Sequence, residues 1–203
     1  MEPKLVENLQ NSSGQTLSTL RGVVLCRCGA SNNKPFCDCS HSLINFSSNN
    51  NNKGQNPTTP KKIKKDYKGE SITIHDNRSI CSHAAYCVEN LSSVFKLNSR
   101  PWINPDEATK EEIIETIRKC PSGALSYSID GIEYKDLDKR EPMITVSKSG
   151  PYLVTGDIEL LGEVQIDDNA SKEHHTLCRC GASNNKPFCD GTHNTINFKD
   201  DKY

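Results

Sequence analysis

Apolar residues fall into short runs along this chain, and polar stretches separate the runs. In the middle of the chain the pattern predicts four elements: strands at 71–75 and 125–129, and helices at 81–91 and 105–119. The second helix has the clearest signature. Asn104 can cap it ahead of a proline, and Ile113, Ile114 and Ile117 share one face. This order of strands and helices is that of an α+β unit.

The end of the chain has a different pattern, in which short apolar runs alternate with turn residues. Strands are predicted at 144–146, 152–154 and 158–161, with turns at Gly150-Pro151 and Gly156-Asp157. We therefore expect an α+β protein that combines a central mixed module with small β-rich modules.

The composition argues against a single large core. Only 33% of the 203 residues are hydrophobic, whereas 10 are cysteines, so small modules held together by metal or disulfide staples are expected. The formal net charge is −1, which gives no reason to expect a nucleic-acid or membrane partner.

The first residues contain no apolar run of the kind that opens a secreted protein. Met1 to Gly14 is polar, and we expect an intracellular protein, with the cytoplasm favoured over the mitochondrion. Because thiols stay reduced inside cells, the cysteines are interpreted as metal ligands rather than as disulfide partners.

A fourteen-residue sequence occurs twice. Leu25 to Asp38 and Leu177 to Asp190 are identical, and a histidine follows each copy, His41 or His193. Identity over a polar, cysteine-rich stretch is not explained by core packing, because cores tolerate hydrophobic exchange. We interpret it as a duplicated binding site, whose ligands would be Cys26, Cys28, Cys37 and His41 in the first copy and Cys178, Cys180, Cys189 and His193 in the second.

Three thiolates and one imidazole suit either zinc or an iron–sulfur cluster. Structural zinc sites usually space their cysteines by two to four residues, whereas here a single residue separates the first pair. The spacing alone leaves both metals open.

The second copy resembles the CDGSH iron–sulfur family over Cys178-x-Cys180, Ser183, Pro187 and the run from Cys189 to His193. The resemblance implies a [2Fe–2S] cluster with three cysteine ligands and one histidine ligand, in a loop below a small β cap. The first copy departs from the family pattern at Cys39, where glycine is usual, and this cysteine is either a tolerated substitution or an alternative ligand to His41. The residues before the first copy are too short and polar to supply such a cap. Arg27 and Arg179, which follow the first cysteine of each copy, either offset the charge of a cluster or lie exposed.

The middle module carries three further cysteines, Cys81, Cys87 and Cys120. Cys81 and Cys87 fit the first and third positions of a Cys-x₂-Cys-x₂-Cys run with Ala84 at the second, and Cys120 precedes a proline. Residues 66–130 are similar to the divergent single-cluster [4Fe–4S] ferredoxin family. Three thiolates imply either a [3Fe–4S] cluster or a [4Fe–4S] cluster whose fourth ligand is His83, water or a partner group.

The sequence thus predicts an iron–sulfur protein that transfers electrons, [2Fe–2S] clusters or both to a redox partner or an apo-protein acceptor. A zinc-stapled interaction module is the alternative, and no enzymatic activity is expected. The two copies are expected to pair within one chain. The predicted divisions are a first CDGSH-type module at 15–46, a disordered Asn/Lys-rich linker at 47–65, a ferredoxin-like module at 66–135 and a second CDGSH-type module with its β cap at 143–198.

Overall fold

The computed structural model describes residues 8–19, 22–48, 64–162, 164, 166 and 170–200. These residues contain both helices and strands, and the strands form two four-stranded sheets, which confirms the α+β prediction. Most of the predicted linker, 49–63, lies outside the described residues. Lys64 and Lys65, assigned above to that linker, belong instead to a strand.

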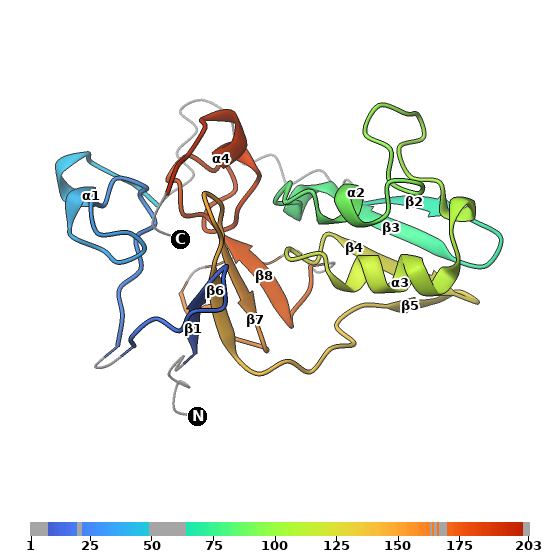
Figure 1. The fold of residues 1–203 in the computed structure, drawn as a ribbon, viewed down its shortest axis with the longest axis horizontal. Coiled ribbons are helices and arrows are strands. Elements are labelled where there is room, and N and C mark those ends of the chain that lie inside the picture. Colours follow the sequence, from blue (N-terminus) through green and yellow to red (C-terminus); the bar gives the residue numbers. More distant parts are fainter. Residues whose placement is uncertain are drawn as a thin grey trace.

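The first sheet has the strand order β1-β6-β7-β8 (Figure 1). Its strands are β1 (Leu9–Asn11), β6 (Met143–Val146), β7 (Tyr152–Thr155) and β8 (His174–Leu177). β1 pairs with β6 in parallel, and the other pairs are antiparallel. The sheet therefore joins residues from both ends of the chain around a small core of Leu9, Leu17, Val146 and Tyr152.

The third strand of this sheet is not where the pattern predicted it. Residues 158–161 form no strand, and Leu161 is exposed; β8, thirteen residues further along, occupies the edge next to β7. The pattern was misleading because β8 begins with two histidines and its only aliphatic residue is Leu177. Its place in the sheet comes from pairing with β7 and not from its own alternation.

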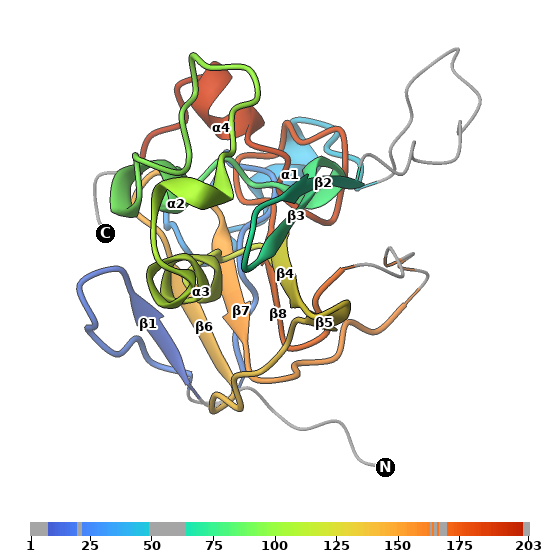
Figure 2. The ribbon, with the colours of Figure 1, turned by 90° about the vertical axis from the view of Figure 1, so that its right-hand side faces the viewer.

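The second sheet has the order β2-β3-β4-β5, and all three pairs are antiparallel. Its strands are β2 (Lys64–Lys68), β3 (Thr73–Asn77), β4 (Leu125–Ile129) and β5 (Ile132–Tyr134). Two helices, α2 (Tyr86–Asn90) and α3 (Lys110–Arg118), lie on one side of it (Figure 2). Ile74, Phe95, Trp102 and Ile113 form the centre of the larger core of the molecule.

The start of α3 differs from the prediction. Asn104 caps a short 3₁₀ helix, Pro105–Glu107, and α3 begins five residues later. Thr109 caps α3 through a capping box in which its hydroxyl accepts from the Glu112 amide and the Glu112 carboxylate accepts from the Thr109 amide. Thr109 lies three residues before Glu112, which is the spacing of a capping box, and this motif determines where α3 begins.

Candidate metal centres

In the first repeat, the sulfur and nitrogen atoms of the predicted ligands lie in two pairs. The Sγ atoms of Cys26 and Cys28 are 3.7 Å apart, and Cys37 Sγ is 3.4 Å from His41 Nδ1. His41 lies in α1 (Ser40–Leu43), which brings it back toward Cys37. The Cys39 amide donates to Cys37 Sγ at 3.4 Å from a left-handed conformation with φ 67°.

The second repeat has almost the same local geometry. Cys178 Sγ and Cys180 Sγ are 3.8 Å apart, and Cys189 Sγ is 3.3 Å from His193 Nδ1 in α4 (Thr192–Thr195). The Gly191 amide donates to Cys189 Sγ at 3.4 Å. The two copies therefore form the same two ligand pairs, although Cys39-Ser40 of the first loop is replaced by Gly191-Thr192 in the second.

These pair distances match two ligands on one tetrahedral metal. For metal–sulfur bonds of about 2.3 Å, two sulfurs on one tetrahedral ion are about 3.8 Å apart. Within the described part of the chain, however, no three histidine, cysteine, aspartate or glutamate side chains converge on a point that would hold a single ion. Each pair in a repeat is therefore spaced to bind one metal ion.

Each loop is held in shape by an aspartate beside its third cysteine. Asp190 Oδ1 accepts from the amide and hydroxyl of Thr192, and Oδ2 accepts from the Asn184 amide. Asp38 makes the equivalent bonds in the first repeat. These hydrogen bonds lower the pKa of Asp38, mainly through the Ser40 hydroxyl. The aspartates therefore form turns that fix the loops around their cysteines.

The two loops pack directly against each other through their glycines. A Cβ atom at Gly29 would lie 2.5 Å from the Cys180 carbonyl oxygen, and one at Gly181 would overlap the Cys28 carbonyl oxygen. Both glycines have a positive φ, 78° and 79°. Only glycine combines this backbone conformation with such a close approach.

The first repeat also depends on the sheet formed largely by the second. Tyr152, on β7, donates from its hydroxyl to the carbonyl oxygens of Cys26 at 2.7 Å and Pro35 at 3.0 Å. Over the described residues 22–48 the first repeat contributes no strand to either sheet. Its loop is anchored instead to a strand more than 100 residues away in the sequence.

The surroundings of the two repeats differ. His193 is 7% exposed, whereas His41 is exposed to solvent. The Arg179 side chain is fully buried: it pairs with Asp200, donates to the Gly150 and Ser147 carbonyls, and stacks near Tyr152 and Phe198. The interpretation that Arg179 lies exposed is therefore wrong, whereas its effect on the charge of a cluster stays a prediction.

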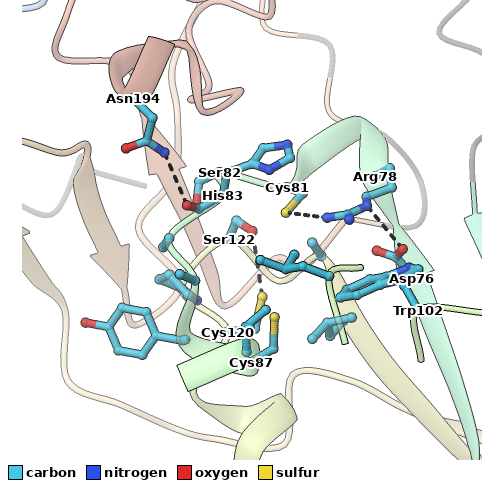
Figure 3. Close-up of a pocket in the computed structure, with 18 residues that line it drawn as sticks. Asp76, Arg78, Cys81, Ser82, His83, Cys87, Trp102, Cys120, Ser122 and Asn194 are labelled. Carbon is cyan, nitrogen blue, oxygen red and sulfur yellow. Dashed lines mark hydrogen bonds and ion pairs between the residues drawn. The ribbon is translucent and has the colours of Figure 1, made fainter. Parts of the chain in front are cut away.

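In the middle module, the three cysteines line a cavity of about 280 Å³ (Figure 3). Cys81 follows a 3₁₀ helix, Arg78–Ile80; Cys87 lies in α2, and Cys120 follows α3. Burial, together with the neighbouring thiols, raises the pKa of Cys87 to about 11. Burial therefore disfavours the thiolate form of Cys87, and a bound cation would favour it.

Arg78 is a part of this site that the cysteine spacing did not predict. Its Nη1 donates to Cys81 Sγ at 3.4 Å, its Nε is 3.3 Å from the buried Asp76 carboxylate, and its guanidinium lies 4.3 Å from the Trp102 ring centroid. An arginine here would offset part of the negative charge of a cysteine-ligated cluster. Its hydrogen bond to Cys81 is local, but no motif in the sequence marked it, and its contact with Trp102 is longer range.

His83, a proposed fourth ligand, does not point at the other ligands. Figure 3 shows its imidazole on the side away from Cys87 and Cys120. The ring lies against Gly191 of the second repeat. Ala84, at the position of the missing cysteine, has no ligating atom, so the fourth ligand stays open.

Comparisons with known proteins match all three regions. The family described as "Divergent 4Fe-4S mono-cluster" matches residues 67–130, and "Iron-binding zinc finger CDGSH type" matches 1–42 and 149–194. Uncharacterized protein YjdI of Escherichia coli K12 is 43% identical over 61 residues, which are 30% of this chain and 80% of that protein. The protein of the same name in strain O157:H7 has the same values.

No solved structure matches the chain significantly. Among the helices of the described residues, none has the length and apolar character that crossing a membrane requires.

Proposed function

Because this chain belongs to the CDGSH-type iron-binding and divergent 4Fe–4S mono-cluster families, we propose that it is a three-cluster electron carrier. Each repeat would hold one [2Fe–2S] cluster, and the middle module one [3Fe–4S] or [4Fe–4S] cluster. The observation that carries this proposal is the spacing of the two ligand pairs in each repeat, each of which suits one tetrahedral metal.

The residues of the chain fit such clusters in three ways. Two cysteines and a cysteine–histidine pair present soft donors at tetrahedral spacing in each repeat. Three thiols line the cavity beside Cys81, with Arg78 to balance negative charge. When bound, a [2Fe–2S] cluster takes up and releases one electron, and a histidine ligand in place of a thiolate raises its potential.

Transfer of whole [2Fe–2S] clusters to an apo-protein is a second activity that the first repeat favours. His41 is exposed, and the neighbouring Leu43 is 85% exposed, so an acceptor protein could approach this ligand directly. Imidazole is also the ligand that protonation most easily removes. The second repeat, with His193 buried, would keep its cluster longer.

The packing of Gly29 and Gly181 supports pairing of the two repeats within one chain. A partner would then be a separate redox protein or a cluster acceptor in a reducing compartment, and we assign the chain no catalytic activity of its own.

Analysis of the purified protein tests the proposal. Protein prepared anaerobically with ample iron should be coloured and contain about seven to eight irons per chain, with matching acid-labile sulfide. EPR of the reduced protein should show distinct two-iron and cubane-type signals. His193→Cys should lower the potential of one two-iron cluster and slow its loss in acid. A colourless protein that contains zinc and no sulfide would identify a zinc-stapled module and refute the proposal.

A further inference from the structure

The middle module packs closely on the second CDGSH-type module at Gly123 and Ser171, and on the ligand loop of the second repeat at His83 and Gly191. A Cβ atom at Gly191 would lie 2.6 to 2.9 Å from three atoms of the His83 side chain, so the glycine backbone rests on the imidazole. Asn194 Nδ2 donates to the His83 carbonyl at 3.4 Å, and Asn185 Nδ2 donates to the Ser79 carbonyl at 3.1 Å. Figure 3 shows Asn194 reaching down from the second repeat to His83.

This contact lies between two sets of ligands. His83 is two residues after Cys81 of the middle site, and Gly191 stands midway between Cys189 and His193 of the second repeat. The two sets of ligands are close enough to affect each other electrostatically. Burial raises the pKa of Cys189 to about 12, and Cys81 makes a smaller contribution to this rise. Burial also lowers the pKa of His193, with a smaller contribution from His83.

The first repeat has a different residue at the corresponding position. Cys39 occupies the place of Gly191 with a similar positive φ, 67° against 85°, but it is exposed. The first repeat instead contacts the second through Gly29 and Gly181. Figure 1 shows the result: the second repeat, with α4, lies between the first repeat and the middle module.

We propose that the His83–Gly191 contact is the junction through which electrons pass between the middle cluster and the cluster of the second repeat. This inference rests on the proposed electron-carrier function. In each transfer one cluster loses a single electron and the other gains it, with no bond made or broken. The order of transfer is then middle module, second repeat, first repeat, in either direction.

The physical reason is the dependence of electron tunnelling on the intervening medium. The tunnelling rate falls exponentially with distance and is higher through bonded and closely packed atoms than across solvent. From Cys81 the chain leads through two peptide units to His83, whose side chain is in van der Waals contact with Gly191. Gly191 lies two residues from each of the ligands Cys189 and His193. Glycine is required at 191 because any Cβ would push the imidazole away.

Position 191 and its counterpart 39 also explain why the middle module contacts the second repeat and not the first. A side chain stands at 39 in the first repeat and none at 191 in the second, although fourteen preceding residues are identical. A docking surface for His83 therefore exists on only one copy. The substitution that departs from the family pattern at Cys39 marks the copy that is not joined to the middle module.

Gly191→Ala tests the junction, with Cys39→Ala as the matched control that places the same residue at the same loop position of the other repeat. Both variants are made in a chain whose Cys26 and Cys28 are replaced by alanine, so that only the middle and second-repeat clusters load. The readout is magnetic coupling between these two clusters in EPR, together with the rate of electron transfer between them after flash reduction. Iron and sulfide content verifies loading in every variant.

We expect magnetic coupling in the parent chain, no change in Cys39→Ala, and a marked loss in Gly191→Ala. Overpacking of one methyl group shifts a docked–undocked equilibrium by about 5- to 150-fold. In a His83→Gly background, Gly191→Ala should have no further effect on docking, because all three atoms that it would meet, the Cβ of residue 83 included, are gone.

The outcomes separate the junction from the proposed function. A chain that assembles no iron–sulfur clusters refutes the electron-carrier proposal itself. A chain that loads both clusters but shows no coupling overturns the junction alone. The junction is equally overturned if Gly191→Ala has the same effect with and without His83, since the strain would then belong to the loop and not to the contact.

Discussion

The buried Arg179 allows a quantitative comparison between two identical sequences. Its side chain is fully buried with that of Asp200, and it donates to two backbone carbonyls, Gly150 at 2.9 Å and Ser147 at 2.6 Å. Arg27, in the same fourteen-residue context, is only partly buried, and its Nε has no hydrogen-bond partner among the residues that the structure describes. Replacing each arginine by alanine therefore isolates the effect of tertiary surroundings on one residue.

The expected cost at Arg179 is large. Removing one partner of a buried ion pair typically costs about 3–5 kcal/mol, because the remaining charge stays desolvated and unpaired. Here Asp200 and two carbonyls would lose their partner together. Arg27→Ala should cost about 0–1 kcal/mol, the range for sites without such a network.

Hydrogen exchange of the loaded protein measures this difference locally. Peptides that cover β7 and β8 should lose protection by about 10²- to 10⁴-fold in Arg179→Ala, whereas a peptide that covers α3 should change little. Arg27→Ala should leave all three peptides near their original rates. Equal effects of the two substitutions, or a loss below about fivefold for Arg179→Ala, would show that the ion pair does not stabilise the sheet.

Three further predictions address single contacts. Tyr152→Phe should speed iron loss from the first repeat more than from the second, because the hydroxyl anchors only the first loop; kinetics of iron release to a chelator, in chains that keep one repeat at a time, distinguish the two. Arg78→Gln should lower the potential of the middle cluster by about 60 mV, one tenfold step in a one-electron equilibrium, since a cation beside Cys81 is lost; an EPR-monitored redox titration that finds an unchanged potential contradicts this role. Thr109→Ala should cost about 1 kcal/mol through loss of the capping box, seen as faster exchange in α3 with β7 unchanged.

Much of the local chemistry follows from short stretches of sequence. The repeat predicted both ligand loops, and the pairing of their sulfur and nitrogen atoms is a local property of Cys-x-Cys and of a histidine four residues after the third cysteine. The assignment of ligands stays a prediction until metal is measured. The α+β class could also be predicted from the sequence, because the periodicity around Ile113 and the turn signals are local.

Other features depended on contacts between residues far apart in the chain. The strand at 174–177 has too few aliphatic residues to show its alternation, and its position comes from β7. Arg78 contacts its neighbours Cys81 and Asp76, but the ring that its guanidinium faces, Trp102, lies in a separate segment. The placement of His83 was equally hidden, since the residue that it touches is more than 100 positions away.

The two copies show most clearly which properties the local sequence determines and which depend on the tertiary structure. Fourteen identical residues specify the same loop twice, because the turns, the aspartate caps and the ligand pairs all involve neighbours within a few positions. Whether the arginine of that loop is buried with Asp200, and whether its histidine is covered or exposed, depends on what packs around each copy. Burial and electrostatic surroundings are properties of the whole fold, so identical segments can carry the same ligands and still differ in stability, solvent access and neighbouring sites.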